Sequence, residues 1–157
     1  MKIKTRSVEE TIEVGRRLGA LLEAGDVVLL VGELGAGKTH FTRGIAMGLG
    51  VSDPYVVTSP TFILMNQYQG RCLIRHFDLY RIEGSELHSL GFQDFRDSGV
   101  SILEWGEKAD PAILKDHLRV EFAITGENSR QMAFSGVGER SGKTIAKMTS
   151  APPHRPQ

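Results

Sequence analysis

One segment near the N-terminus has the residue types and spacing of a phosphate-binding loop. Residues 32–39 read GELGAGKT and fit the pattern G-x-x-x-x-G-K-[ST] at every fixed position. Glycines let such a loop curl so that successive backbone N–H groups point at phosphate oxygens. Lys38 would place a positive charge near the β- and γ-phosphates, and the Thr39 hydroxyl would be a ligand of Mg²⁺. The segment therefore predicts a site for ATP or ADP with Mg²⁺, whose nucleotide contacts are Gly32, Glu33, Leu34, Gly35, Ala36, Gly37, Lys38 and Thr39.

Two acidic residues could complete a site for ATP hydrolysis, which needs carboxylates for the metal ion and for the attacking water. Glu104 follows the apolar run 100–103, as in a Walker B motif, and Asp78 follows the run 73–77. Ligand sites of α/β sheets form at such carboxyl ends of strands. Thr61 lies in the Ser/Thr/Pro-containing segment 58–62 and is a candidate sensor of the γ-phosphate. The sequence leaves open that these are ordinary strand-end carboxylates and a loop hydroxyl.

Other residues near these motifs could have either a functional or a structural role. His76 and Arg81 flank Asp78, and a single histidine is more often structural than catalytic. Trp105 follows Glu104 and could either stack on a nucleotide base or belong to the core. A second GKT at residues 142–144 lacks a glycine five positions before Gly142, so we do not assign it to a phosphate site.

The segments around the motifs alternate between strand and helix patterns. Ser7 and Glu10 form a capping box before a predicted helix over 8–23. The run 27–31 has the apolar, β-branched character of a strand that is buried on both faces. Alternation of strands and helices predicts a single α/β, P-loop NTPase-like domain, with a mixed, mainly parallel sheet flanked by helices. The remaining predicted elements are a helix over 38–49, a loop over 50–61, a hairpin of strands 62–68 and 72–77, a short helix over 83–90, and strands over 100–105 and 118–124.

Composition narrows the range of functions. The chain has 157 residues, 19 Lys+Arg against 19 Asp+Glu, and one cysteine. Zero net charge does not favour a nucleic-acid coat or a membrane surface as partner, and a single cysteine rules out an internal disulfide. The N-terminus lacks the apolar core of a signal peptide and the run 27–31 is too short to span a bilayer, so we expect a cytoplasmic protein with no membrane and no DNA partner.

The C-terminal part has a different composition. From Gly126 the chain is polar and rich in Gly and Ser, with five Lys/Arg against two Glu, a net charge of +3. We therefore predict a P-loop ATPase domain over 1–125 and a polar, basic C-terminal extension over 126–157 that is at least partly disordered.

Taken together, the motifs resemble a known family. GELGAGKT at 32–39, TSPTF at 58–62, HFDLYR at 76–81, LGF at 90–92 and EW at 104–105 occur in the order and spacing of TsaE, also called YjeE. The resemblance covers about residues 5–125. It implies a Mg²⁺-dependent ATPase of bacterial tRNA threonylcarbamoyladenosine biosynthesis, acting on the partners TsaD and TsaB, which modify adenosine 37 of tRNA. The chain would therefore reach tRNA indirectly. The resemblance further implies that Thr39 and Glu104 hold Mg²⁺, that Asp78 serves hydrolysis, and that the segment Ser7 to Thr11, with Trp105, lies near the base.

The sequence departs from the family pattern in places. His40 stands where the family usually has a second threonine, at the start of the helix near the α-phosphate, and Gly106 replaces a common proline. Two alternatives stay open. A small-molecule kinase would share the P-loop, although residues 107–125 lack the Arg-rich cluster of a kinase lid. A binding switch would use nucleotide only to change a protein interface.

Overall fold

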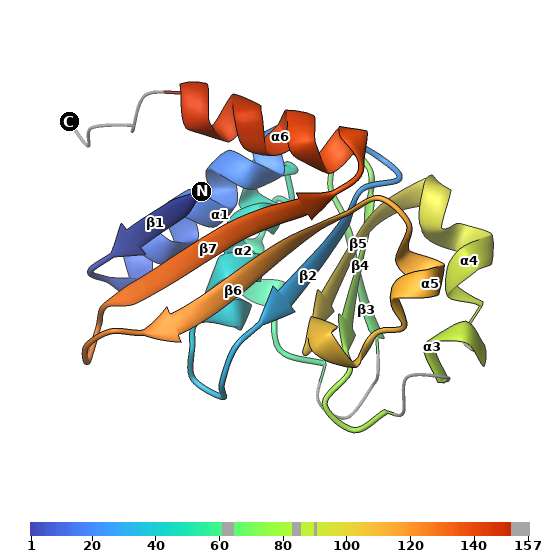
Figure 1. The fold of residues 1–157 in the computed structure, drawn as a ribbon, viewed down its shortest axis with the longest axis horizontal. Coiled ribbons are helices and arrows are strands. Elements are labelled where there is room, and N and C mark those ends of the chain that lie inside the picture. Colours follow the sequence, from blue (N-terminus) through green and yellow to red (C-terminus); the bar gives the residue numbers. More distant parts are fainter. Residues whose placement is uncertain (61–64, 83–85, 90, 152–157) are drawn as a thin grey trace.

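A computed structural model of the protein describes residues 1–60, 65–82, 86–89 and 91–151. Thr61, predicted to sense the γ-phosphate, lies outside these residues. In Figure 1 the chain alternates between strands and helices. The strands are β1 (Lys2–Thr5), β2 (Val27–Val31), β3 (Met65–Gln69), β4 (Leu73–Asp78), β5 (Gly99–Glu104), β6 (His117–Ile124) and β7 (Arg130–Val137). The helices are α1 (Val8–Leu21), α2 (Lys38–Gly48), α3 (Glu86–Ser89), α4 (Phe92–Phe95), α5 (Pro111–Leu114) and α6 (Glu139–Ser150), with short 3-10 helices η1 (Pro54–Val56), η2 (Arg96–Ser98) and η3 (Gly106–Lys108).

The described strands form one mixed sheet in the order β1-β7-β6-β2-β5-β4-β3. The central strands β6, β2, β5 and β4 run parallel, whereas β7 and β1 at one edge and β3 at the other are antiparallel to their neighbours. Parallel strands place their carboxyl ends at one edge of the sheet, so the segments following β2, β4 and β5 meet there. The α/β architecture predicted from the sequence is confirmed.

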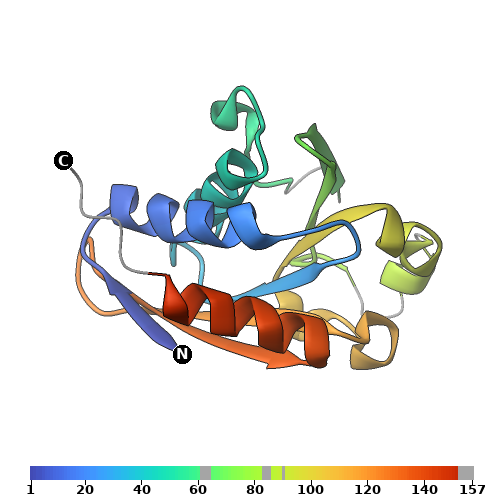
Figure 2. The same ribbon diagram turned by 90° about the horizontal axis from the view of Figure 1, so that it is seen from above.

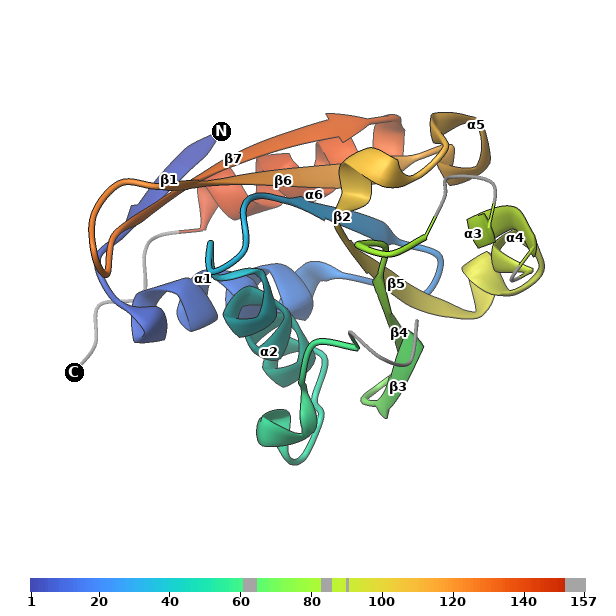
Figure 3. The same cartoon turned by 90° about the horizontal axis from the view of Figure 1, so that it is seen from below.

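The strand before the P-loop is buried on both faces, as its apolar run predicts. Val28 and Leu30 of β2 belong to a core with α1, α2 and α6, while Val27 and Leu29 belong to a second core with α3, α4 and α5. Successive strand residues point to opposite faces, so each core takes alternate side chains of β2. Figures 2 and 3 show α1, α2 and α6 gathered on the same side of the sheet.

The helix after the P-loop packs closely on α1. A Cβ atom on Gly44 would lie 2.1 Å from the carbonyl oxygen of Ile12, so only glycine permits this approach. The capping box at the start of α1 is confirmed in part. Glu10 donates its N–H to the Ser7 hydroxyl, but its carboxylate accepts from Arg6 N–H rather than from Ser7.

The C-terminal segment departs from the prediction of a separate extension after residue 125. Residues 130–137 form β7, which pairs with β6 and β1, and residues 139–150 form α6 on the same sheet. Met132 and Phe134 alternate into the core, and Met148 of α6 joins them. The sequence does not indicate this strand, because only Met132 and Phe134 of β7 are buried and polar or small residues flank them on both sides. The second GKT lies within α6, and residues 152–157 are outside the described part.

No helix among the described residues is long and apolar enough to cross a membrane.

Candidate functional site

The P-loop runs from the end of β2 to the first turn of α2. Gly37 has a φ of 99°, in the left-handed region that glycine adopts without strain, and α2 begins at the next residue. Ala36 N–H donates to the Glu33 carbonyl at 3.0 Å, which closes a turn inside the loop. The free N–H groups at the start of α2 and the positive end of its dipole make this loop suited to an anion.

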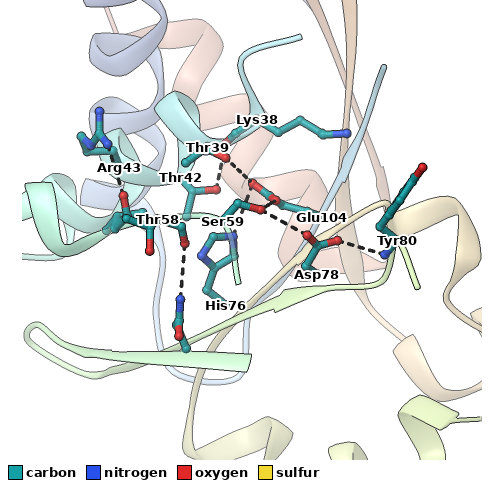
Figure 4. A network of polar contacts seen from close by, with 12 residues as sticks. Lys38, Thr39, Thr42, Arg43, Thr58, Ser59, His76, Asp78, Tyr80 and Glu104 are labelled. Atoms are coloured by element: carbon teal, nitrogen blue, oxygen red, sulfur yellow. Dashed lines mark hydrogen bonds and ion pairs between the residues drawn. The ribbon is translucent and has the colours of Figure 1, made fainter. Parts of the chain in front are cut away.

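The two candidate carboxylates lie side by side beneath the loop. Asp78 and Glu104 are direct register partners at the ends of β4 and β5. The Ser59 hydroxyl lies between them, 3.1 Å from Asp78 Oδ2 and 3.2 Å from Glu104 Oε2 (Figure 4). Asp78 Oδ1 also accepts the N–H of Tyr80 at 2.9 Å, so both of its oxygens are oriented. Parallel pairing of β4 and β5 therefore joins two acidic residues that are far apart in the sequence.

Of the two carboxylates, Glu104 is the one that contacts the P-loop. Its Oε1 accepts from the Thr39 hydroxyl at 3.1 Å and lies 3.4 Å from Nε2 of His76 (Figure 4). Burial opposes ionisation of Glu104, but the nearby His76, Thr39 and Ser59 outweigh it, so its pKa lies below the ordinary value. Glu104 is thus an ionised carboxylate in a buried place.

His76 is fully buried behind Glu104. Its Nδ1 lies 3.3 Å from the Tyr68 hydroxyl, and its Nε2 makes no hydrogen bond within the described residues. The ring therefore faces Glu104 while a tyrosine fixes its other side. This arrangement suits a structural support of the site.

The donor set fits a magnesium ion that is shared with phosphates. The described residues include no group of three or more His, Cys, Asp or Glu side chains arranged to hold a metal alone. Mg²⁺ usually takes one or two protein oxygens together with substrate phosphates and water. Glu104 and the Thr39 hydroxyl, 3.1 Å apart, offer such hard oxygen ligands next to the loop.

Lys38 and Trp105 lie against each other at the mouth of the site. Lys38 Nζ is 3.7 Å from the centroid of the Trp105 ring and donates to the carbonyl of Gly32. The ring of Trp105 also contacts that of Tyr80, with centroids 4.9 Å apart. These side chains line a cavity of about 460 Å³ together with the P-loop, Asp78 and Glu104. This volume is in the usual range for small-molecule sites.

The structure places the two segments implied to lie near a base in different cavities. Ser7 and Thr11 line a smaller cavity of about 80 Å³ with Asn128 and Arg130, and Trp105 is not among its residues. The two cavities share Gly35, Gly37 and His40. Burial and the nearby Arg43 and Arg130 lower the pKa of His40, which favours a neutral ring there.

Sequence reasoning missed several residues of this region. Ser59 was visible as part of 58–62, but only the fold shows that it joins the two carboxylates. Tyr80 lies within HFDLYR, where no feature of the sequence shows that its N–H binds Asp78. Arg130 had no signal at all, because it lies in the segment assigned to the extension, yet it contacts the carbonyl oxygens of Gly35 and Ala36.

Comparison with known proteins gives a consistent family. A family model described as threonylcarbamoyl adenosine biosynthesis protein TsaE matches residues 5–132. The tRNA threonylcarbamoyladenosine biosynthesis protein TsaE of Bacillus subtilis is 36% identical over 142 residues, covering 89% of this chain and 88% of that protein. The protein of the same name from Streptomyces coelicolor is 41% identical over 138 residues, covering 82% and 91%. The crystal structure of Bacillus subtilis YdiB matches with a TM-score of 0.73 and 29% identity, over 95% and 93% of the two chains.

Proposed function

Because the chain belongs to the TsaE family, we propose that it binds and hydrolyses Mg²⁺-ATP as a component of the machinery that forms threonylcarbamoyladenosine in tRNA. The observation that carries the ATPase assignment is the network that joins Thr39 of the P-loop to Glu104, Ser59 and Asp78. It brings together a phosphate-binding loop, a candidate metal ligand set and a second carboxylate beside them.

Each residue has a distinct role in this proposal. The P-loop amides and Lys38 bind the β- and γ-phosphates, and Glu104 and Thr39 hold Mg²⁺. The metal, when bound, neutralises charge on the phosphate oxygens. Asp78 orients the attacking water, since Ser59 and Tyr80 N–H fix the direction of its carboxylate. Trp105 lies with Lys38, Asp78 and Glu104, which supports a place for it at the triphosphate end rather than at the base.

The base and ribose are assigned to the other side of the loop. Ser7 and Thr11 line the cavity that adjoins the main one at Gly37 and His40. His40 is in the first turn of α2, close to where an α-phosphate would lie. We retain Thr61 as a candidate sensor of the γ-phosphate on the basis of its place in the 58–62 motif.

Partner proteins fit the exposed surface around the site. Leu34 at the tip of the P-loop is 87% exposed and Tyr80 is 51% exposed, although both are large apolar or aromatic residues. Such side chains at the mouth of a site suit contact with another protein. We propose relatives of TsaD and TsaB as these partners, with slow hydrolysis alone and faster hydrolysis in the complex. The formal net charge of zero supports an indirect approach to tRNA.

Steady-state phosphate release tests the proposal. The protein is assayed alone, with tRNA, and with TsaD and TsaB relatives, each with and without Mg²⁺. Acceleration by the partner proteins is the expected result. Nucleotide binding without turnover in every mixture would favour a binding switch, and transfer of phosphate to a small acceptor would favour a kinase.

A further inference from the structure

The C-terminal strand β7 supplies a side chain to the P-loop, beside the cavity that Ser7 and Thr11 line. Arg130 is the first residue of β7, and its guanidinium donates from Nε to the Ala36 carbonyl and from NH2 to the Gly35 carbonyl, both at 3.1 Å. Its NH1 donates to the turn between β6 and β7, at 2.8 Å to Ser129 O and 3.2 Å to Gly126 O. One side chain therefore joins the P-loop to this turn.

The two carbonyl contacts set the orientation of two peptide units. In a trans peptide the C=O and the following N–H point in opposite directions. With Gly35 C=O directed at Arg130, Ala36 N–H points away from it and donates to Glu33 O at 3.0 Å. With Ala36 C=O directed at Arg130, Gly37 N–H also points away from Arg130. Arg130 thus fixes two consecutive peptide units, of which the first has its N–H in the turn to Glu33 and the second has the Gly37 N–H directed away from Arg130.

The loop needs such a restraint because glycines surround the two peptide units. Gly35 and Gly37 have φ values of 80° and 99°, and glycine passes between left- and right-handed conformations at little cost. A peptide unit next to a glycine can therefore rotate and turn its N–H outward. The planar guanidinium bonds two neighbouring carbonyls at once, which a lysine ammonium cannot do with the same geometry.

We propose that Arg130 is a positioning residue of the P-loop, which fixes the peptide units 35–36 and 36–37 so that the turn to Glu33 is held and the Gly37 amide is ready for a phosphate. This inference rests on the proposed nucleotide site. It assigns a role in that site to a strand outside the motifs of residues 32–105.

The test compares Arg130→Gln and Arg130→Lys with the wild-type protein and with the control Arg119→Gln. Arg119 lies on the neighbouring strand β6, and its guanidinium pairs with Glu121 instead of the loop. Binding of Mg²⁺-ADP and of Mg²⁺-pyrophosphate is measured by calorimetry. Hydrogen exchange of residues 32–38 and 125–130 is measured without ligand, together with the midpoint of denaturation.

Arg130→Gln is expected to weaken ADP and pyrophosphate by the same factor, roughly tenfold, because it loses charge-assisted bonds that organise the loop. Exchange in residues 32–38 rises. Arg130→Lys recovers part of the affinity, and Arg119→Gln binds as the wild type does. If Arg130→Gln proves unfolded by its denaturation curve, the lysine variant carries the comparison.

Three outcomes would overturn the inference, and they are distinct. Wild-type affinity and wild-type exchange in the Arg130 variants would remove the positioning role while leaving the nucleotide site intact. A loss for ADP with unchanged pyrophosphate binding would show that Arg130 contacts the nucleoside instead. A wild-type protein that binds neither probe would overturn the proposed function itself.

Discussion

The ammonium group of Lys38 lies 3.7 Å from the centroid of the Trp105 ring, on the side of the P-loop that faces the two carboxylates. Burial lowers the pKa of Lys38, and the nearby Glu104, Glu107 and Asp78 counter only part of this effect. A cation above an indole ring gains about 0.5–2 kcal/mol. We expect a phosphate that binds Lys38 to draw the ammonium group away from the Trp105 ring. On this expectation the surroundings of Trp105 change when nucleotide binds.

Fluorescence should report this exchange directly, since Trp105 is the one tryptophan of the chain. Adding Mg²⁺-ADP is expected to change the emission intensity as Lys38 leaves the ring. Lys38→Met should change the spectrum of the free protein and remove most of the response to ADP. An identical response in the wild type and in Lys38→Met would show that Lys38 stays on Trp105 when nucleotide binds.

Lys38→Ala is expected to weaken ATP binding by tenfold or more and to leave the fold intact. A charge-assisted contact to phosphate contributes roughly 1.5–3 kcal/mol, and each 1.4 kcal/mol is tenfold in affinity. The matched control is Lys108→Ala, because Lys108 lies near Tyr80 at the edge of the same region but donates to the Tyr80 carbonyl. Calorimetry and thermal unfolding separate binding from stability. Equal ATP affinity in both variants would contradict the role of Lys38.

Glu104→Gln should reduce hydrolysis at least a hundredfold, roughly 2.7 kcal/mol at 1.36 kcal/mol per tenfold, and weaken the dependence of nucleotide binding on Mg²⁺. The amide keeps the size of the side chain but removes the charge that a metal ligand needs. Glu107→Gln is the control, since Glu107 also lies close enough to affect Lys38 but is exposed on η3. Wild-type hydrolysis and an unchanged Mg²⁺ titration in Glu104→Gln would show that Asp78 or another group, and not Glu104, binds the metal.

The sequence predicts this site well where the chemistry is local. The P-loop pattern places Gly37, Lys38 and Thr39 correctly between a buried strand and a helix, because loop and flanks are contiguous. The acidic residues at strand ends are also visible. Their distance from each other is not, because it depends on the pairing of β4 with β5. The bridging position of Ser59 depends on the same pairing.

The strand β7 and the place of Arg130 depend on contacts between distant segments, which the order of apolar and polar residues does not reveal. Residues 130–137 have only two fully apolar inward positions, Met132 and Phe134, and a strand of this kind gains its order from β1 and β6 on either side. The role of Arg130 follows from that pairing, since its contacts with the loop span more than ninety residues of sequence.

Asp116→Asn is expected to lower stability without changing nucleotide affinity. The Asp116 carboxylate accepts from Arg140 N–H at 2.8 Å and Ser141 N–H at 3.0 Å and so caps α6. Loss of such a cap costs about 0.5–2 kcal/mol. Burial raises the pKa of Asp116, but the hydrogen bonds from Ser141 and Arg140 together outweigh it and hold the pKa below the ordinary value.

The sign of the pH dependence follows from that lowered pKa. The stabilisation is fully present above the pKa of the unfolded chain, about 3.9, and is lost as the pH falls through the lower pKa of the folded protein. In urea denaturation the wild type should therefore have a higher free energy of unfolding than Asp116→Asn at pH 7. This difference should shrink as the pH falls below about 4. If the difference in free energy of unfolding stays constant down to pH 2.5, the charge of the Asp116 carboxylate is not what stabilises the wild type.

Truncations test whether the C-terminal segment belongs to the fold. A chain that ends at Ala151 keeps α6 and the contacts of Arg17 with the carbonyls of Met148 and Ala151. It should unfold at the wild-type temperature and bind ADP with wild-type affinity. A chain that ends at residue 125 loses β7, which removes the partner of β1 and uncovers β6.

The energetic cost of the longer deletion is large compared with the stability of a domain. Met132, Phe134 and Met148 are buried, and the ring of Phe134 lies 6.2 Å from that of Phe41 at the start of α2. Loss of each buried side chain costs about 2–5 kcal/mol, against a total stability of about 5–15 kcal/mol. We therefore expect the chain ending at residue 125 to show no cooperative thermal transition. A sharp transition together with ADP binding in that chain would restore the boundary after residue 125, and it would also remove β7 and Arg130 from any necessary part in the P-loop.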